Sequence, residues 1–258
     1  HLYDYFLRPG GSYFGAKTAL RPVHIQYSYD DHSVWLVNAT LAARDGLTAT
    51  ATLYSLDSKV VARSSAAALD LAGDGNVAVL DLGDAINTHR DELAPVFFLD
   101  LRLADADGNE IDRNFYWLDT VGDQFDMVYR DYELPDVTVA DMTALAGLPK
   151  AEVAVSAPVP APVPGPDPVP GPDPVPGPDP VPDKVEYAFD VTNTSDLIAF
   201  FVEILLVGDD GGPILPAVYS DNYVSLIPGE KRTITVTIDT PAPGSAEPSV
   251  TVRGWNVN

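Results

Sequence analysis

The chain has 258 residues, of which 46% are hydrophobic, so it can bury the core of one or two ordinary domains. Its 38 acidic residues against 15 Lys and Arg give a formal net charge of −23, which excludes the basic surface that nucleic acids and anionic membranes attract. Cysteine is absent, which excludes disulfides and thiolate ligands, and no apolar run is long enough for a membrane-spanning helix.

The choice of charged residues also carries information. Thirty of the 38 acidic residues are Asp, and only five residues are Lys. This composition keeps a surface hydrated and resembles that of halophilic proteins, with an acidic secreted protein as the alternative. The chain starts at His1 without an initiator Met or the charged and apolar regions of a leader, so we expect an excerpt or a processed product.

The opening segment, Leu2–Lys17 (LYDYFLRPGGSYFGAK), is rich in Tyr and Phe around a Pro-Gly-Gly turn and does not look like a sandwich strand. A short helix is expected over Tyr13–Leu20. Beyond it, short β-branched and aromatic runs separated by turn residues predict strands. In the first half these strands are Val23–Tyr29, Val34–Leu41, Thr48–Leu56, Lys59–Ala67, Val96–Leu103 and Ile111–Leu118.

The last two of these strands predict a β-hairpin, because Gly108 and Asn109 between them are turn formers. Carboxylate and amide side chains at this turn also suggest a calcium loop: Asp105, Asp107, Asn109, Glu110 and Asp112. The glycine comes two positions too early and no Glu stands at the twelfth position, so we predict a turn instead. The histidines are too far apart to form a metal motif. We expect no metal and no cofactor.

The second half contains a short helix candidate, Asp141–Leu148, and further strand-like runs. These runs are Lys184–Val191, Ile198–Val207, Ala217–Val224, Arg232–Ile238 and Ser249–Trp255. Regular short strands with Gly, Asp and Pro turns are typical of antiparallel sandwiches. The predicted fold class is therefore all-β, with two immunoglobulin-like antiparallel β-sandwiches in tandem.

A proline-rich segment interrupts the second half. Every even position from Pro158 to Pro182 is proline, and GPDPVP occurs three times within it. Such a segment cannot donate to a ladder and favours extended polyproline II. It looks like an interdomain linker, but the five strands after it are too few for an immunoglobulin-like sandwich. We predict instead that Lys150–Ser156 pairs with Lys184–Val191, so residues 157–183 form an insertion within one sandwich.

Four segments together resemble glycoside hydrolase family 2, in particular the exo-β-D-glucosaminidases that act on chitosan. They are LYDYFLRPGGSYFGAK at Leu2–Lys17, the run Phe97–Leu118 with RNFYWL, Tyr219–Glu230 with SDNY and PGE, and VRGWNV at Val252–Val257. The resemblance implies three parts: the end of a catalytic (β/α)₈ barrel at residues 1–20, a sandwich at 21–135 and a C-terminal sandwich at 136–258. It also implies that the catalytic carboxylates stand on barrel strands that this sequence lacks.

Four residues are candidates for substrate contact, namely Tyr3, Asp4, Tyr5 and Tyr13. Barrel active sites lie at the carboxyl ends of strands and in the loops that follow, and the resemblance places these residues just after such a strand. Aromatic rings stack on sugars, and a carboxylate can bind hydroxyls or an ammonium. The alternative is that they pack the barrel end against the first sandwich. No catalytic residue is assigned.

Two other patterns favour structure over function. The N-x-S/T sequons at Asn38 and Asn193 carry little weight, because short sequons arise by chance. Trp35, Trp117 and Trp255 lie in predicted strands, so we expect them in a sandwich core or domain interface rather than as sugar platforms.

The resemblance implies that the parent protein is a secreted retaining glycosidase that releases glucosamine from the non-reducing ends of chitosan oligosaccharides. Chitosan or a related glycan is the expected partner, bound through the missing barrel, and the sequence does not indicate what the proline-rich segment binds. Two alternatives stay open. One is a β-mannosidase-type member of the same family, and the other is a non-catalytic extracellular module for adhesion or glycan binding.

Overall fold

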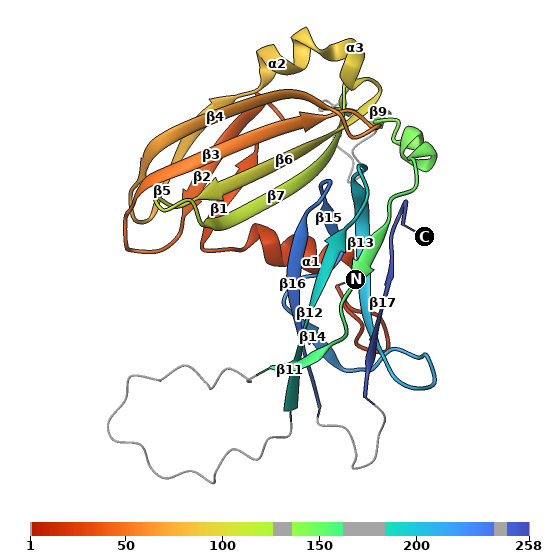
Figure 1. Cartoon of the computed structure of the whole chain (residues 1–258). Coiled ribbons are helices and arrows are strands. Elements are labelled where there is room, and N and C mark those ends of the chain that lie inside the picture. The colour runs from red at the N-terminus through yellow and green to blue at the C-terminus, as the bar shows by residue number, and fades with distance from the viewer. Residues whose placement is uncertain (1, 126–135, 162–183, 240–246, 258) are drawn as a thin grey trace, which may run out of the picture. The chain divides into compact units, whose positions relative to one another are not determined.

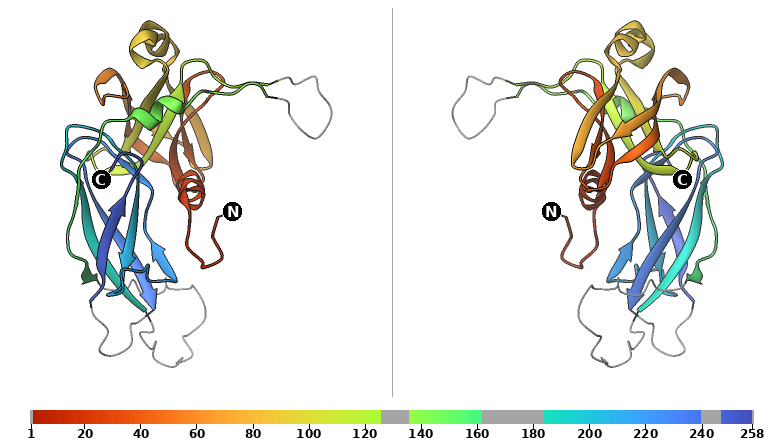
Figure 2. Two further views of the ribbon diagram at one scale, coloured as in Figure 1. Left: turned by 90° about the vertical axis from the view of Figure 1, so that its right-hand side faces the viewer. Right: turned by 90° about the vertical axis from the view of Figure 1, so that its left-hand side faces the viewer.

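The computed structural model describes residues 2–125, 136–161, 184–239 and 247–257, and antiparallel strands dominate it (Figure 1). Two compact units make up the chain: Ala16–Pro149, and His1–Gly15 together with Lys150–Asn258. Figure 2 shows both from two further sides. Each unit has an immunoglobulin-like fold, which confirms the predicted fold class. The domain boundaries predicted at residues 20 and 135 stay predictions.

The unit Ala16–Pro149 contains two sheets. The smaller has the strand order β1-β2-β5, formed by β1 (Val23–Tyr27), β2 (Ser33–Asn38) and β5 (Gly75–Asp81). The larger has the order β4-β3-β6-β7, formed by β3 (Arg44–Tyr54), β4 (Val60–Leu71), β6 (Val96–Ala104) and β7 (Glu110–Asp119). Their inward side chains share one core, with Ile25 and Leu36 from the first sheet and Leu53 and Leu101 from the second.

The remaining elements of this unit are short. They are β8 (Gln124–Phe125), β9 (Asp136–Thr138), α2 (Gly83–Thr88), α3 (Arg90–Leu93) and the 3₁₀ helix η1 (Thr143–Gly147). The sequence predicted neither β5 nor the helices α2 and α3. The helix predicted at Asp141–Leu148 is instead the 3₁₀ turn η1, because this segment makes i→i+3 bonds such as Leu148 N–H to the Leu145 carbonyl at 3.3 Å.

The other unit also contains two sheets. One has the order β10-β12-β16-β14, with β11 also paired to β12; its strands are β10 (Val153–Val155), β11 (Val159–Ala161), β12 (Lys184–Asn193), β14 (Ala217–Tyr219) and β16 (Lys231–Asp239). The second has the order β15-β13-β17, formed by β13 (Ala199–Val207), β15 (Val224–Leu226) and β17 (Ser249–Arg253). Alternation along β16 buries Ile234, Val236 and Ile238, as the sequence predicted.

The pairing predicted across the proline-rich segment is confirmed. Strand β10 runs antiparallel to β12, with Val153 opposite Asn193 and Val155 opposite Val191. The first residues of the predicted insertion, Val159–Ala161, form strand β11, whose Pro160 lies opposite Tyr187 of β12. Proline is tolerated there because β11 lies at a sheet edge. The GPDPVP repeats lie outside the described residues, so their polyproline II conformation stays a prediction.

The single strand predicted at Ala217–Val224 is divided in two, because the chain changes sheets there. Strand β14 pairs with β16, whereas β15 pairs with β13 of the other sheet. Asn222 lies buried between them, accepting the Ile204 N–H at 2.7 Å and donating to the Ile204 carbonyl at 2.8 Å. The next residue, Tyr223, has φ +52° and directly precedes β15, so the chain is not extended between the two strands.

The N-terminal segment packs with this second unit. Helix α1 (Gly11–Ala19), close to the predicted Tyr13–Leu20, buries Phe14 in the same core cluster as Val202, Val224 and Val236. The first fifteen residues and the C-terminal sandwich are therefore one packing unit, although more than 130 residues separate them in sequence.

Candidate functional site

Residues 2–10 form a loop that closes on itself. The Gly10 N–H donates to the Leu2 carbonyl at 3.1 Å, and Tyr3 and Pro9 form an isolated β-bridge. Inside the loop, Asp4 Oδ1 accepts the N–H groups of Phe6 at 2.8 Å and Arg8 at 2.9 Å. A short carboxylate side chain suits this role because it satisfies backbone donors that a tight turn leaves unpaired.

A hollow of about 620 Å³ lies beside this loop, within the range of small-molecule sites. Its lining consists of Leu2, Tyr3, Asp4, Tyr5, Arg8, Pro9, Gly10 and Tyr223. Three of the four residues predicted from the sequence, Tyr3, Asp4 and Tyr5, therefore lie together. The Tyr5 side chain is 92% exposed. Asp4 accepts both backbone N–H groups through one carboxylate oxygen, Oδ1.

Tyr13 has a different position from the other three. It does not line the hollow, but its ring centroid lies 5.0 Å from that of Tyr3. Its hydrogen bond to Tyr3 raises the pKa of the Tyr3 hydroxyl. Further ring contacts lead to Phe14 at 5.0 Å and on to Tyr223 at 6.0 Å. Tyr13 thus connects the loop to Phe14 in the core of the C-terminal sandwich. The packing alternative given above, against the first sandwich, stays a prediction.

The hollow borders a buried ionic cluster centred on Glu203 of β13, which is 6% exposed. Its Oε1 accepts hydrogen bonds from the Arg8 guanidinium and from the Tyr223 hydroxyl, the latter at 2.6 Å. Its Oε2 accepts one from Arg253. Burial raises the pKa of Glu203, but the hydrogen bonds from Arg253, Tyr223 and Arg8 outweigh burial and hold it below its usual range. The same environment raises the pKa of Tyr223 to about 12.

Sequence reasoning missed this cluster. Its members lie in four segments, and nothing in their spacing brings Arg8 to Glu203. One signal was available: Glu203 is the only charged residue of the otherwise apolar strand Ala199–Val207. A lone carboxylate in a buried strand requires partners, since an unpaired buried charge is costly.

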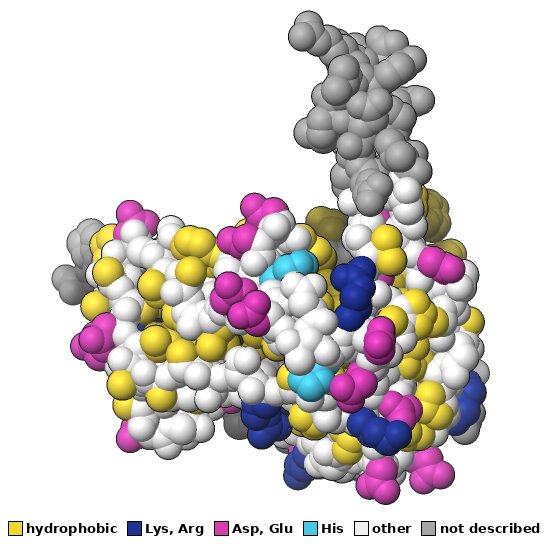
Figure 3. All heavy atoms as spheres, turned by 90° about the horizontal axis from the view of Figure 1, so that it is seen from above, with side chains coloured by type: hydrophobic (Ala, Val, Ile, Leu, Met, Phe, Trp, Pro, Cys, Tyr) yellow, Lys and Arg dark blue, Asp and Glu magenta, His cyan; other side chains and the backbone are white. Residues whose placement is uncertain are grey.

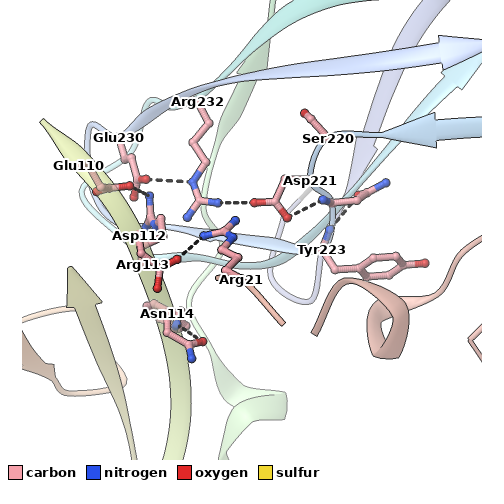
Figure 4. Close-up of polar contacts among 12 residues, drawn as sticks. Arg21, Glu110, Asp112, Arg113, Asn114, Ser220, Asp221, Tyr223, Glu230 and Arg232 are labelled. Atoms are coloured by element: carbon pink, nitrogen blue, oxygen red, sulfur yellow. Dashed lines mark hydrogen bonds and ion pairs between the residues drawn. The ribbon is translucent and has the colours of Figure 1, made fainter. Parts of the chain in front are cut away.

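The other unit has a corresponding buried carboxylate, Asp112 of β7. Its Oδ2 bonds His24 Nδ1 and the Ile25 N–H, both at 2.8 Å. Its Oδ1 accepts a hydrogen bond from Arg21 at 2.7 Å (Figure 4). Burial raises the pKa of Asp112, but the bonds from His24, Arg21 and Ile25 outweigh burial and lower it. This carboxylate therefore joins β1 to β7, and both of its oxygens bond protein groups of its own unit.

The hairpin predicted at the β6–β7 turn is confirmed. Phe98 lies opposite Trp117 in the ladder, and Asp105 Oδ1 accepts the N–H groups of Asp107 at 3.0 Å and Asn109 at 2.8 Å. Within the part of the chain that the structure describes, no three His, Asp or Glu side chains gather as metal ligands would.

The SDNY and PGE residues hold the sheet-switching turn in place. Arg232 donates to Asp221 at 3.0 Å and to Glu230 at 3.1 Å, so both acidic residues of these motifs share one guanidinium (Figure 4). Asn222 bridges to β13, and Tyr223 donates to Glu203. The residues of these motifs therefore have a structural role: their hydrogen bonds hold the turn between β14 and β15 against β13 and β16.

Both sequon asparagines are buried. Asn193 is fully buried and donates to three backbone carbonyls, while its Oδ1 accepts the Ser195 N–H and hydroxyl. Asn38 binds Thr40 in the same way. Of the three tryptophans expected in a core or an interface, Trp35 is half-buried, whereas Trp117 is 41% exposed and Trp255 is 55% exposed, so these two are not core residues. Their place in an interface stays a prediction.

The comparisons with known proteins agree on the type of domain. Residues 132–257 match the exo-beta-D-glucosaminidase Ig-fold domain, and residues 30–121 match the mannosidase Ig/CBM-like domain. The chain is 37% identical over 99% of its length to an exo-beta-D-glucosaminidase of Streptomyces avermitilis, of which it covers 26%. It is 33% identical to the corresponding enzyme of Amycolatopsis orientalis, of which it covers 23%.

The structural comparison gives the same result. The crystal structure of the Amycolatopsis orientalis exo-chitosanase CsxA matches all of this chain with a TM-score of 0.82, and the match covers 28% of that protein. A variant of the same enzyme has been solved with PNP-beta-D-glucosamine. A mannosylglycoprotein endo-beta-mannosidase of Lilium longiflorum is 24% identical over 99% of this chain. The chain thus spans about a quarter of the length of its curated relatives.

A membrane-spanning helix requires a minimum length and hydrophobicity. Among the described residues there is no helix long and apolar enough to cross a membrane.

Proposed function

We propose that the protein containing this chain releases glucosamine from the non-reducing ends of chitosan oligosaccharides. The chain belongs to the C-terminal region of the exo-β-D-glucosaminidases of glycoside hydrolase family 2. The observation that carries the proposal is the identity of 37% with an exo-beta-D-glucosaminidase across 99% of the chain. Two Ig-type domain matches in succession, over residues 30–121 and 132–257, give it further support.

In this proposal the catalytic carboxylates lie in the portion of the relatives that this chain does not span. Retaining hydrolysis requires two carboxylates about 5–5.5 Å apart, one as nucleophile and one as acid and base. The buried carboxylates Glu203 and Asp112 are committed to Arg, His and Tyr donors within their own units. The sandwiches act as supports for a catalytic barrel.

The loop of residues 2–10 would contribute to substrate contact. Tyr3 and Tyr5 present rings that can stack on the apolar face of a sugar, and Asp4 adds a carboxylate beside them. Glucosamine carries an ammonium at neutral pH, and a nearby carboxylate favours that charge. The hollow thus combines the two features that an amino sugar requires.

Product analysis tests the proposed activity. The full-length protein is incubated with chitosan oligomers labelled at the reducing end, and the products are followed by mass spectrometry and by proton NMR of the new anomeric centre. We expect glucosamine to appear while the labelled oligomer shortens one unit at a time, with the β-anomer formed first. Cleavage at internal bonds, or no release of glucosamine, would overturn the proposal.

A β-mannosidase activity is the second candidate. Residues 30–121 match a mannosidase Ig/CBM-like domain, and the lily endo-beta-mannosidase is similar over 99% of the chain. Parallel assays with β-mannosides separate the two activities, because release of mannose without glucosamine would favour this candidate.

The site of action is also a proposal. A polymer such as chitosan must be degraded outside the cell, so we propose that the protein is secreted. Activity in the culture medium supports secretion, and activity confined to the washed cells contradicts it.

A further inference from the structure

The anchor of the loop at residues 2–10 lies in the C-terminal sandwich. Glu203 stands on β13 among buried apolar neighbours, with Val202 and Ile204 fully buried on either side of it. A carboxylate in this setting is stable only if charged donors compensate for its lost hydration. The donors that Glu203 recruits therefore determine which segments it holds together.

These donors come from three directions. Arg253 lies directly across the ladder from Glu203 on β17, so this pair is internal to one sheet. Tyr223 comes from the turn between β14 and β15. Arg8 alone of the three donors comes from the N-terminal loop, 195 residues away in sequence. Two donors thus hold the sandwich together, and the third holds the loop to it.

The loop can move as a single body, because its own hydrogen bonds close it. Asp4 holds the N–H groups of Phe6 and Arg8, and the Gly10 N–H is bonded to the Leu2 carbonyl. Whatever fixes Arg8 therefore fixes Tyr3, Asp4 and Tyr5 as well. Tyr223 adds a second link, because it donates to Glu203 and also lines the hollow.

We propose that Glu203 is a positioning residue: by clamping Arg8 onto the C-terminal sandwich, it sets the place of the loop that carries Tyr3, Asp4 and Tyr5. The clamp is a property of this chain, whereas its effect on catalysis rests on the proposed function. The C-terminal sandwich then takes part in shaping the substrate site, in addition to supporting a barrel.

Hydrogen–deuterium exchange on the 258-residue chain tests the clamp. Arg8→Met removes the positive charge that the loop donates to Glu203 and keeps much of the side-chain length. Arg253→Met removes the other cation that bonds Glu203 and serves as the matched control. We expect exchange in the peptide spanning residues 2–10 to rise at least tenfold in Arg8→Met and to stay within twofold of the parent in Arg253→Met. Peptides from β12 and β16 should keep their protection in both variants.

Equal exchange in the two variants, or no change in Arg8→Met, would overturn the clamp. Glu203→Gln should loosen the loop as Arg8→Met does. If Glu203→Gln fails to fold, the comparison of the two arginine variants still decides the question.

Kinetics of the full-length protein on chitosan oligomers test the positioning role. We expect Arg8→Met to raise KM at least fivefold and to lower kcat less than twofold, with Arg8→Lys restoring most of the loss. Lys231→Met is the control. It removes an exposed charge that pairs with Asp190 on the sheet that does not contain Glu203, and it should leave KM and kcat unchanged. A loosened loop with unchanged KM would refute the positioning role. A wild-type protein inactive on chitosan would refute the proposed function and leave the exchange result standing.

Discussion

Glu203 in one unit and Asp112 in the other are buried carboxylates that several donors hold. Each receives three donors, and each joins segments that are far apart in sequence. Breaking a buried pair is costly because the remaining charge loses its compensation. Loss of the hydrogen bonds to either side chain should therefore destabilise the whole unit in which it lies.

The lowered pKa values of these carboxylates predict acid lability. A carboxyl whose folded-state pKa lies below its unfolded value, 4.5 for Glu203 and 3.8 for Asp112, stabilises the fold fully above that value. The stabilisation is lost as pH falls through the folded-state pKa. Urea unfolding between pH 7 and pH 2.5 should therefore show a decline below about pH 4.5. Glu203→Gln should be less stable at pH 7 and show a shallower decline, and a slope equal to that of the parent would contradict the assignment.

A second prediction at this scale concerns Asn193. Its amide serves three carbonyls and the Ser195 donors in a fully buried site, so Asn193→Ala leaves several polar groups unsatisfied. We expect a loss of about 2–4 kcal/mol in unfolding free energy, since each orphaned group costs about 1–3 kcal/mol. Asn109→Ala at the exposed hairpin turn is the control, with a loss below about 1 kcal/mol. Glycosylation at Asn193 in a secreting host would contradict its burial.

The residues of the candidate site were only partly predictable from the sequence. Tyr3, Asp4 and Tyr5 stand within three positions of one another, so their proximity follows from covalent connection. Arg8 and Tyr223 meet only through the fold, and no local pattern joins residues more than 200 positions apart. Their roles as substrate contacts stay a prediction.

At the scale of elements, helix α1 depends on a close approach of its first residue to β13. A Cβ at Gly11 would lie 2.6 Å from the Phe201 ring, whereas a Cβ at Gly15 in the same helix would meet nothing within 4 Å. The Phe201 ring packs against the Tyr223 ring, with centroids 5.2 Å apart, which restricts how far it can withdraw.

The two glycines therefore predict opposite effects of the same substitution. Gly11→Ala should destabilise the chain by about 1–3 kcal/mol, because overpacking forces side chains off their rotamers. Gly15→Ala should stabilise it by up to about 1 kcal/mol, the usual gain in a helix interior. Chemical denaturation measures both, and Phe201→Leu should rescue Gly11→Ala. Equal effects of the two substitutions would exclude the steric explanation.

Strands were predicted best where alternation was clear. The β16 residues Ile234, Val236 and Ile238 alternate with threonines and are buried as expected. The division into β14 and β15 was missed because it depends on the tertiary bond between Asn222 and Ile204. Helices α2 and α3 were missed because they are short, and tertiary packing rather than local pattern fixes such elements. Strand β5 was missed because its residues are exposed or half-buried, so no apolar alternation marks it.

At the scale of the whole molecule, we predict that the sandwich does not require the GPDPVP segment. The strands on either side of it, β11 and β12, are paired, with Ala161 opposite Glu186. Loop closure costs only about 0.6 kcal/mol for each doubling of length. Replacing residues 163–182 with a four-residue Gly-Ser turn should therefore change the unfolding free energy by less than about 1–2 kcal/mol. A larger loss would show that the segment contributes contacts to the fold.

The net charge also belongs to the whole molecule. Acidic side chains (magenta) are dispersed over the face that Figure 3 shows, as expected when charge keeps a surface hydrated. A surface of this kind opposes self-association and suits either a halophilic or an acidic secreted protein. The halophilic origin stays a prediction.

The measurement that bears most directly on the account is the ratio of kcat/KM for p-nitrophenyl β-D-glucosaminide to that for p-nitrophenyl β-D-mannoside, taken with the full-length protein. A site built to bind the ammonium should reject the sugar that lacks it, so we predict a ratio of at least about 100. A ratio below one would contradict the account and place the protein with the β-mannosidases.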